Sequence, residues 1–218
     1  MPVARLRLGS PRLAAPKGAL WIGVVGMLVT TALGFTVTAM SDWQESTFVF
    51  DEWLHSQGNS VCDWIALHLD AIDKPTVVAV ILLVGGVIIW LWRGLLPGIG
   101  FMVVAGVGWL LIAAVKILVH EPRPTTFFPE LQEQALSYPS GHVTFVMALT
   151  VAAGAALVGT KWRWPIVTVL LVLTLATAWS RLYLGVHYPM DVFGGLLGGF
   201  AGAMLVIGFW NLLFARRR

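Results

Sequence analysis

Charged side chains are scarce in this sequence. Only 11% of its residues are charged and 58% are hydrophobic, whereas a typical soluble domain has about 25% charged residues. A soluble protein of 218 residues has no core large enough to hide that much apolar surface. The composition therefore excludes a soluble domain and indicates a protein that lies in a lipid bilayer.

Cysteine is almost absent, since Cys62 is the only one. An intrachain disulfide is excluded, and cysteine usage gives no information about the redox compartment. The sequence also lacks internal repeats and low-complexity segments. We therefore expect a single membrane domain over residues 1–218.

Long apolar runs are what the sequence has in abundance. A transmembrane helix needs about 20 mostly apolar residues, and six runs approach or exceed this length, at residues 20–40, 76–92, 98–119, 142–160, 165–183 and 190–214. We expect an all-α integral membrane protein with a six-transmembrane-helix bundle. The last run contains Gly194, Gly195, Gly198, Gly199 and Gly202, and such small residues favour packing inside the bundle over a dimer face.

The first run raises the question of a signal peptide. Signal peptides have an apolar region of about 7–15 residues, and the run at residues 20–40 is longer. We therefore expect an uncleaved first span. Cleavage after Ala39 is the alternative, and it would leave five spans in the same orientation.

The basic residues lie on one side of the predicted spans. They are Arg5, Arg7, Arg12 and Lys17 before the first span, Arg93, Lys161 and Arg163 in later loops, and Arg216 to Arg218 at the end. The acidic residues lie on the other side or at its edge. Short basic loops stay in the cytoplasm, so we expect a multi-pass protein of the plasma (inner) membrane with both termini cytoplasmic. The net charge of +3 reflects this topology, and we expect no nucleic-acid partner.

The longest polar stretch, residues 41–74, is predicted to lie outside the cytoplasm. It interleaves acidic residues with apolar ones and contains Trp43, Trp53 and Trp64. Tryptophan is enriched at the bilayer interface, which predicts an extracytoplasmic amphipathic segment between helices one and two. Its role stays open between a packing element and the lip of a lipid entrance.

A set of ionisable residues recurs at one membrane depth near the outer ends of the predicted spans. The set comprises Lys116, Arg123, His142, Arg181, His187 and Asp191. A charge inside a span costs about 2.5–3.5 kcal/mol at the bilayer centre and less toward its edge. Any one of these residues alone is explained by snorkelling or by a structural role. Their convergence from several helix ends predicts a functional site.

The composition of this set points to a phosphate ligand. Three fixed cations, Lys116, Arg123 and Arg181, suit a dianionic tetrahedral group. The turn Pro139-Ser140-Gly141-His142 enters a helix, so its backbone N–H groups and the helix dipole would face an anion. Ser140 is also a natural helix N-cap, which is its structural alternative.

Two histidines and one carboxylate then predict a mechanism. One histidine attacks phosphorus and the other protonates the departing oxygen. Asp191 follows His187 closely, so it is the expected orienting carboxylate, His187 the nucleophile and His142 the acid, then the base for water. A zinc site of His120, His142, His187 and Asp191 is the alternative. The surrounding cations disfavour it, so we expect neither metal nor cofactor.

The spacing of these residues resembles the three-part signature of the type 2 phosphatidic acid phosphatase superfamily. The parts are Lys116-x6-Arg123-Pro124, Pro139-Ser140-Gly141-His142 and Ser180-Arg181-x5-His187-x3-Asp191. The resemblance implies a six-helix core, an outward-facing site and metal-independent hydrolysis through a phosphohistidine on His187. It also implies phosphate contacts from Lys116, Arg123, Ser140, Gly141 and Arg181.

The substrate implied by this resemblance is a lipid phosphate in the membrane. We expect a polyprenyl pyrophosphate first and a glycerolipid phosphate, such as phosphatidate or phosphatidylglycerophosphate, second. A phosphotransferase that passes the phosphoryl group to an acceptor lipid stays open, as does a catalytically silent transporter or scaffold.

Overall fold

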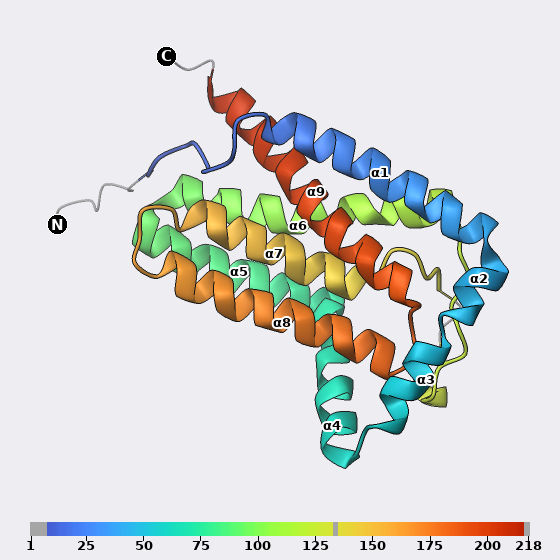
Figure 1. Cartoon of the computed structure of the whole chain (residues 1–218). Coiled ribbons are helices and arrows are strands. Elements are labelled where there is room, and N and C mark those ends of the chain that lie inside the picture. Colours follow the sequence, from blue (N-terminus) through green and yellow to red (C-terminus); the bar gives the residue numbers. More distant parts are fainter. Residues whose placement is uncertain (1–7, 133–134, 216–218) are drawn as a thin grey trace.

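The computed structural model describes residues 8–132 and 135–215, and the part that it describes contains helices and no β-strands. The elements are α1 (Ala19–Ala39), α2 (Ser41–Ser46), α3 (Val49–Ser56), α4 (Ser60–Leu69), η1 (Asp70–Asp73), α5 (Pro75–Arg93), α6 (Leu95–Val119), η2 (Pro129–Leu131), α7 (Gly141–Ala156), α8 (Arg163–Tyr183) and α9 (Pro189–Ala215) (Figure 1). The basic residues Arg5, Arg7 and Arg216 to Arg218, on which the predicted orientation partly rests, lie outside the described residues.

Five of the helices are long and apolar enough to cross a membrane. They are α1, α5, α6, α8 and α9, and their bounds lie within three residues of the predicted runs. The fourth predicted run differs, because α7 has only 16 residues and ends at Ala156 instead of 160. The chain turns there, with Gly159 at a φ of 76°, although the residues up to Val158 are still apolar.

Helix α7 lies in the middle of the bundle, and most of its side chains are buried. It packs against α6, α8 and α9, while α5 packs on α6 and α1 on α9. The glycines of α9 permit these close approaches. A Cβ added at Gly199 would lie 2.6 Å from the Thr144 carbonyl oxygen, and one at Gly202 would lie 2.6 Å from the Gly108 carbonyl oxygen. Packing of these glycines inside the bundle is thus confirmed.

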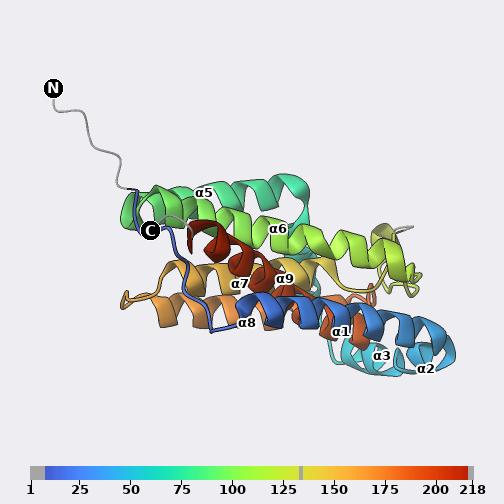
Figure 2. The same ribbon diagram turned by 90° about the horizontal axis from the view of Figure 1, so that it is seen from above.

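The segment between α1 and α5 lies at one end of the bundle, opposite the end at which α9 finishes (Figures 1 and 2). It forms three short helices and the 3-10 turn η1. Asn59 separates α3 from α4, because its side chain accepts hydrogen bonds from the Val61 and Cys62 backbone N–H groups. Trp43, Trp53 and Trp64 are all exposed on this segment, and α3 and α4 pack against α8.

Candidate active site

His187 and Asp191 form a buried pair at the start of α9. Pro189 begins the helix, so Asp191 sits in its first turn and reaches back to His187. The His187 Nδ1 atom lies 3.2 Å from Asp191 Oδ2. The His187 residue is 1% exposed and Asp191 is fully buried. The contact leaves Nε2 as the ring nitrogen that can react.

Asp191 is held by several hydrogen bonds besides the one to His187. The Ser137 hydroxyl donates to Oδ2 over 2.5 Å, and the Tyr188 backbone N–H donates to the same oxygen over 2.9 Å. The Gln44 amide of α2 donates to Oδ1 over 3.2 Å. Several donors on one buried carboxylate fix its position.

Glu121 is a second buried carboxyl group in this part of the molecule. The Gln44 amide also donates to Glu121 Oε1 over 3.1 Å. Burial, followed by the proximity of Asp191, raises the pKa of the Glu121 carboxyl to about 9. The raised pKa favours the neutral, protonated form of the Glu121 carboxyl.

His187 is neutral in this environment. Burial of the imidazole, and then the nearby charges of Arg123, Lys116 and Arg181, hold the pKa of His187 well below its ordinary value. A neutral imidazole keeps the lone pair that nucleophilic attack requires. The three predicted phosphate-binding cations are thus close enough to His187 to affect its charge.

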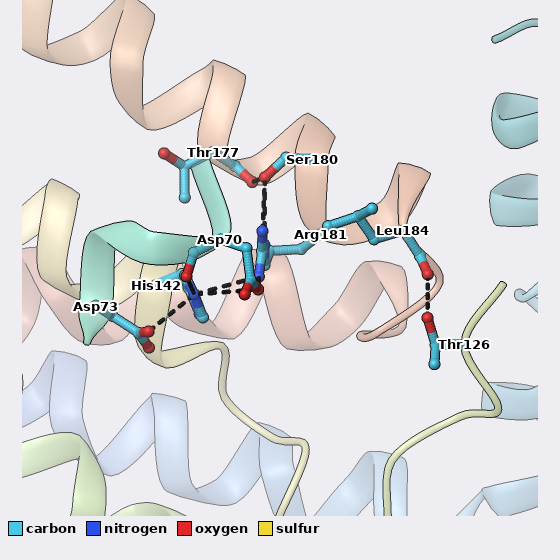
Figure 3. A network of polar contacts seen from close by, with 8 residues as sticks. All are labelled: Asp70, Asp73, Thr126, His142, Thr177, Ser180, Arg181 and Leu184. Atoms are coloured by element: carbon cyan, nitrogen blue, oxygen red, sulfur yellow. Dashed lines mark hydrogen bonds and ion pairs between the residues drawn. The ribbon is translucent and has the colours of Figure 1, made fainter. Parts of the chain in front are cut away.

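A second polar cluster joins His142, Arg181, Asp70 and Asp73 (Figure 3). The Arg181 Nη1 atom lies 2.6 Å from Asp70 Oδ1 and 3.2 Å from His142 Nε2. The His142 Nε2 atom lies 2.8 Å from Asp73 Oδ1. Burial alone would raise the pKa of Asp70, but the Arg181 guanidinium outweighs it and lowers that pKa. Both carboxylates come from η1, which the sequence did not assign to the site.

The turn before α7 shows features of an anion-binding site. Ser140 is fully buried and stands at the N-cap of α7, yet its hydroxyl makes no cap bond and has no hydrogen-bond partner among the described residues. A Cβ added at Gly141 would lie 3.3 Å from Asp73 Oδ2 and 3.9 Å from Lys116 Cε. Gly141 therefore lies where the side chains of Asp73 and Lys116 approach the backbone of the turn.

The remaining predicted cations line the same region. The Lys116 ammonium donates to the Leu136 carbonyl over 2.9 Å and to the Ser137 carbonyl over 2.8 Å. Arg123 lines a cavity of about 100 Å³ together with His142, Asp70 and Asp73. All eight residues predicted for the site are thus gathered at the ends of α6, α7, α8 and α9.

The zinc alternative receives no geometric support. His120 is exposed at the C-terminal end of α6, away from the buried His187. Within residues 8–132 and 135–215, no group of three or more His, Cys, Asp or Glu side chains is arranged to hold a metal ion.

Five residues of the site were missed from the sequence, namely Gln44, Asp70, Asp73, Glu121 and Ser137. Glu121 and Ser137 had a signal, because Glu121 lies between Lys116 and Arg123 and Ser137 shortly precedes Pro139. The other three lie in the segment of residues 41–74, whose amphipathic pattern only indicated a surface element.

Comparison with known proteins identifies the family of this chain. The sequence profile of the PAP2 superfamily matches residues 97–215. Undecaprenyl-diphosphatase BcrC of Bacillus subtilis is 32% identical over 119 residues, which are 51% of this chain and 55% of that protein. Phosphatidylglycerophosphatase B of Bacillus subtilis is 32% identical over 123 residues, 54% of this chain and 58% of that protein. The matches therefore span just over half the length of these two relatives.

A further relative and a solved structure extend the comparison. The putative undecaprenyl-diphosphatase YbjG of Escherichia coli K12 is 39% identical over 79 residues, 35% of this chain and 36% of that protein. The crystal structure of a PAP2-type phosphatidylglycerolphosphate phosphatase from Bacillus subtilis superposes with a TM-score of 0.72 at 19% identity, over 91% of this chain and 98% of that one. At this identity the likeness shows the fold. With its profile matched over more than half of its length, the chain belongs to the PAP2 superfamily, the type 2 phosphatidic acid phosphatases.

Proposed function

We propose that this protein is a membrane lipid phosphatase that works through a phosphohistidine on His187 and without a metal. The observation that carries the proposal is the buried His187, whose Nδ1 atom contacts Asp191 and whose pKa is lowered by burial and by the nearby charges of Arg123, Lys116 and Arg181. Fixed cations stabilise the charge of a transferring phosphoryl group. The named phosphatases among its relatives support the same reaction class.

The first step transfers the phosphoryl group to the enzyme. The His187 Nε2 lone pair forms a bond to phosphorus while the bond from phosphorus to the lipid oxygen breaks. His142 gives a proton to that departing oxygen. Asp191 accepts the Nδ1–H hydrogen bond and stabilises the positive charge that develops on the His187 ring.

The second step returns the enzyme to its starting state. Water attacks the phosphorus, His142 takes a proton from that water, and the bond between His187 Nε2 and phosphorus breaks. Inorganic phosphate is the product. The unpartnered Ser140 hydroxyl and the N-terminal end of α7 supply hydrogen-bond donors for the phosphoryl oxygens in both steps.

For the substrate, we propose a polyprenyl diphosphate first and a glycerolipid phosphate second. The support is that two of the relatives named above are undecaprenyl-diphosphatases, one of them putative, and another a phosphatidylglycerophosphatase. The cavity of about 100 Å³ beside His142 and Arg123 is small and polar, which suits a phosphate group whose lipid tail stays in the bilayer.

The same proposal includes the topology. We place six spans in the membrane, both termini in the cytoplasm and the site outside it. Helix α7 has 16 residues, about 24 Å at 1.5 Å per residue, against a hydrocarbon core of about 30 Å. Its burial among α6, α8 and α9 supports a sixth span, because a helix that packs on three long apolar helices lies at the same depth as they do.

Purified protein in detergent micelles tests this function with a panel of lipid phosphates. We expect release of inorganic phosphate that persists in a chelator of divalent metals. Activity that is lost on chelation and restored by zinc or magnesium would contradict the mechanism. Transfer of phosphate to an added lipid without release would identify the phosphotransferase, and no turnover on any substrate would favour a silent transporter or scaffold.

A further inference from the structure

Each histidine of the site is bound to a carboxylate through one ring nitrogen only. His187 uses Nδ1 toward Asp191. His142 uses Nε2, which lies 2.8 Å from Asp73 Oδ1 and 2.9 Å from the Asp70 carbonyl oxygen (Figure 3). The two pairs therefore engage opposite nitrogens of their rings.

The other nitrogen of His142 is left available. All hydrogen bonds and ion pairs that the ring makes with the described residues run through Nε2. None of these contacts involves Nδ1, and the His142 residue is 8% exposed. His142 lines the cavity that Arg123 also lines, so the ring borders the space in which a phosphate ester would bind.

We propose that Asp73 is the positioning carboxylate of His142 and that Nδ1 of His142 transfers the protons of the reaction. This inference rests on the proposed phosphatase function. Asp73 accepts the Nε2–H hydrogen bond, which fixes the tautomer that keeps the Nδ1 lone pair basic. The carboxylate also stabilises the imidazolium that must exist before the first step and again after water has been deprotonated.

The proton balance follows from this assignment. In the first step the Nδ1 proton moves to the lipid oxygen as its bond to phosphorus breaks and the bond from His187 Nε2 to phosphorus forms. In the second step water forms a bond to phosphorus, the bond to His187 breaks, and the water proton moves to Nδ1. The proton that Nε2 shares with Asp73 stays in place throughout.

Asp73 and Asp70 contact different side chains. Asp70 Oδ1 lies 2.6 Å from Arg181 and 3.7 Å from His142 Nε2, so Asp70 is mainly the partner of the arginine. Asp73 Oδ1 is the nearest carboxylate atom to the ring. The charged and titratable groups around His142 are Asp70 and Asp73 of η1, Arg181 of α8, His187 before α9, and Arg123 and Lys74 at the same cavity.

A competing interpretation of Asp70 and Asp73 predicts a different effect of their substitution. Asp70 and Asp73 lie where phosphoryl oxygens would contact Arg181 and His142, so they could act as an internal anion that substrate must displace. Removing a competitor strengthens the apparent binding of every oxyanion. Removing a positioning group instead slows the chemical step and leaves oxyanion binding nearly unchanged.

The test compares Asp73→Asn and Asp73→Glu in the full chain, with Asp42→Asn on the exposed face of α2 as the matched control. We expect Asp73→Asn to lower kcat by about tenfold or more, part of the general acid–base contribution, with KM changed less than about twofold. The pH optimum of kcat should move to lower pH, because the imidazolium loses its carboxylate partner. Asp73→Glu should recover part of the rate, and Asp42→Asn should match the wild type.

The leaving group gives a readout that a structural role would not produce. An activated aryl phosphate needs little protonation of its leaving oxygen, so the first-step burst of Asp73→Asn should be preserved with it and lost with a lipid phosphate. An unchanged kcat in Asp73→Asn overturns the inference, as does vanadate inhibition that strengthens about tenfold while the rate rises. If the wild-type protein releases no phosphate, the phosphatase proposal itself fails. If the wild type is active and Asp73→Asn has the same kcat, only the inference about Asp73 fails.

Discussion

The side-chain amide of Gln44 lies 3.2 Å from Asp191 Oδ1, although 147 positions separate the two residues in the chain. The same nitrogen lies 3.1 Å from Glu121 Oε1. Gln44 is buried on α2, the first element after α1. The short helices between α1 and α5 therefore contribute directly to the support of Asp191, in addition to covering the end of the bundle.

Replacing this amide should slow catalysis. Gln44→Leu removes both hydrogen bonds and leaves two buried carboxyl groups with one donor fewer, a change worth about 1–3 kcal/mol. We expect kcat with a lipid phosphate to fall by about tenfold. Gln57→Leu is the matched control, since Gln57 is exposed at the end of α3. Equal rates for Gln44→Leu and wild type would show that the amide does not support Asp191.

The two histidines should respond differently to substitution. His187→Ala should abolish phosphate release and covalent labelling by a radiolabelled substrate. His142→Ala should be nearly inactive on a lipid phosphate monoester. With a pyrophosphate or an aryl phosphate it should accumulate phosphoenzyme, because hydrolysis of the phosphoenzyme then lacks a base. Rapid-quench labelling measures this. Labelling that persists in His187→Ala and vanishes in His142→Ala would reverse the two roles.

Substitution of Ser140 should weaken ligand binding and leave the stability of the fold unchanged. Its hydroxyl makes no hydrogen bond with the described residues, so Ser140→Ala should leave the unfolding temperature within about 1 °C of the wild type. A donor to a bound oxyanion contributes about 1.5–3 kcal/mol, so inhibition by vanadate should weaken by at least about tenfold. Ser137→Ala is the contrasting variant, because its hydroxyl donates to Asp191 over 2.5 Å. Loss of stability in Ser140→Ala without a change in vanadate inhibition would indicate a structural role.

Asp51 should make the stability of the protein depend on pH. It is fully buried on α3, and both of its carboxyl oxygens lack hydrogen-bond partners among the described residues. Burial, and then repulsion by Asp191, raises its pKa from 3.8 to about 8. Because the folded state holds the proton more tightly, this stabilisation is fully present below pH 3.8 and is lost as the pH rises toward about 8.

Asp51→Asn removes that dependence. The unfolding temperature of the variant should exceed that of the wild type by an amount that grows between about pH 4 and pH 8 and then stays constant. Each kcal/mol corresponds to roughly 2–4 °C for a chain of this size. Glu52→Gln, at the exposed neighbouring position, is the control. Parallel curves for Asp51→Asn and wild type would refute the raised pKa.

The sequence predicted the long helices well because a spanning helix must be apolar over its whole length. The end of α7 was missed because Leu157 and Val158 remain apolar beyond the helix, so hydropathy alone cannot locate the turn. His187 and Asp191 could be paired from their spacing, since four positions bring side chains together at a helix start.

The partners of the site could not be predicted in the same way. Gln44 and Asp73 reach Asp191 and His142 across long stretches of chain, and their own segment has the pattern of a surface helix. Such contacts depend on how η1 and α2 fold over the end of the bundle. Local spacing contains no information about that placement.

The packing of α1 on α9 has a consequence for biosynthesis. A Cβ added at Gly23 would lie 2.3 Å from the Leu205 backbone nitrogen, and the Asn211 side chain hydrogen-bonds the Leu13 backbone. Helix α1 therefore finds its main packing partner only when α9 has been synthesised. Chains are synthesised from the N-terminus, so the face of α1 that carries Gly23 stays uncovered until the residues of α9 have been made. Asp191 lies on α9, so a ribosome that stalls before α9 leaves a chain in which His187 lacks its carboxylate partner.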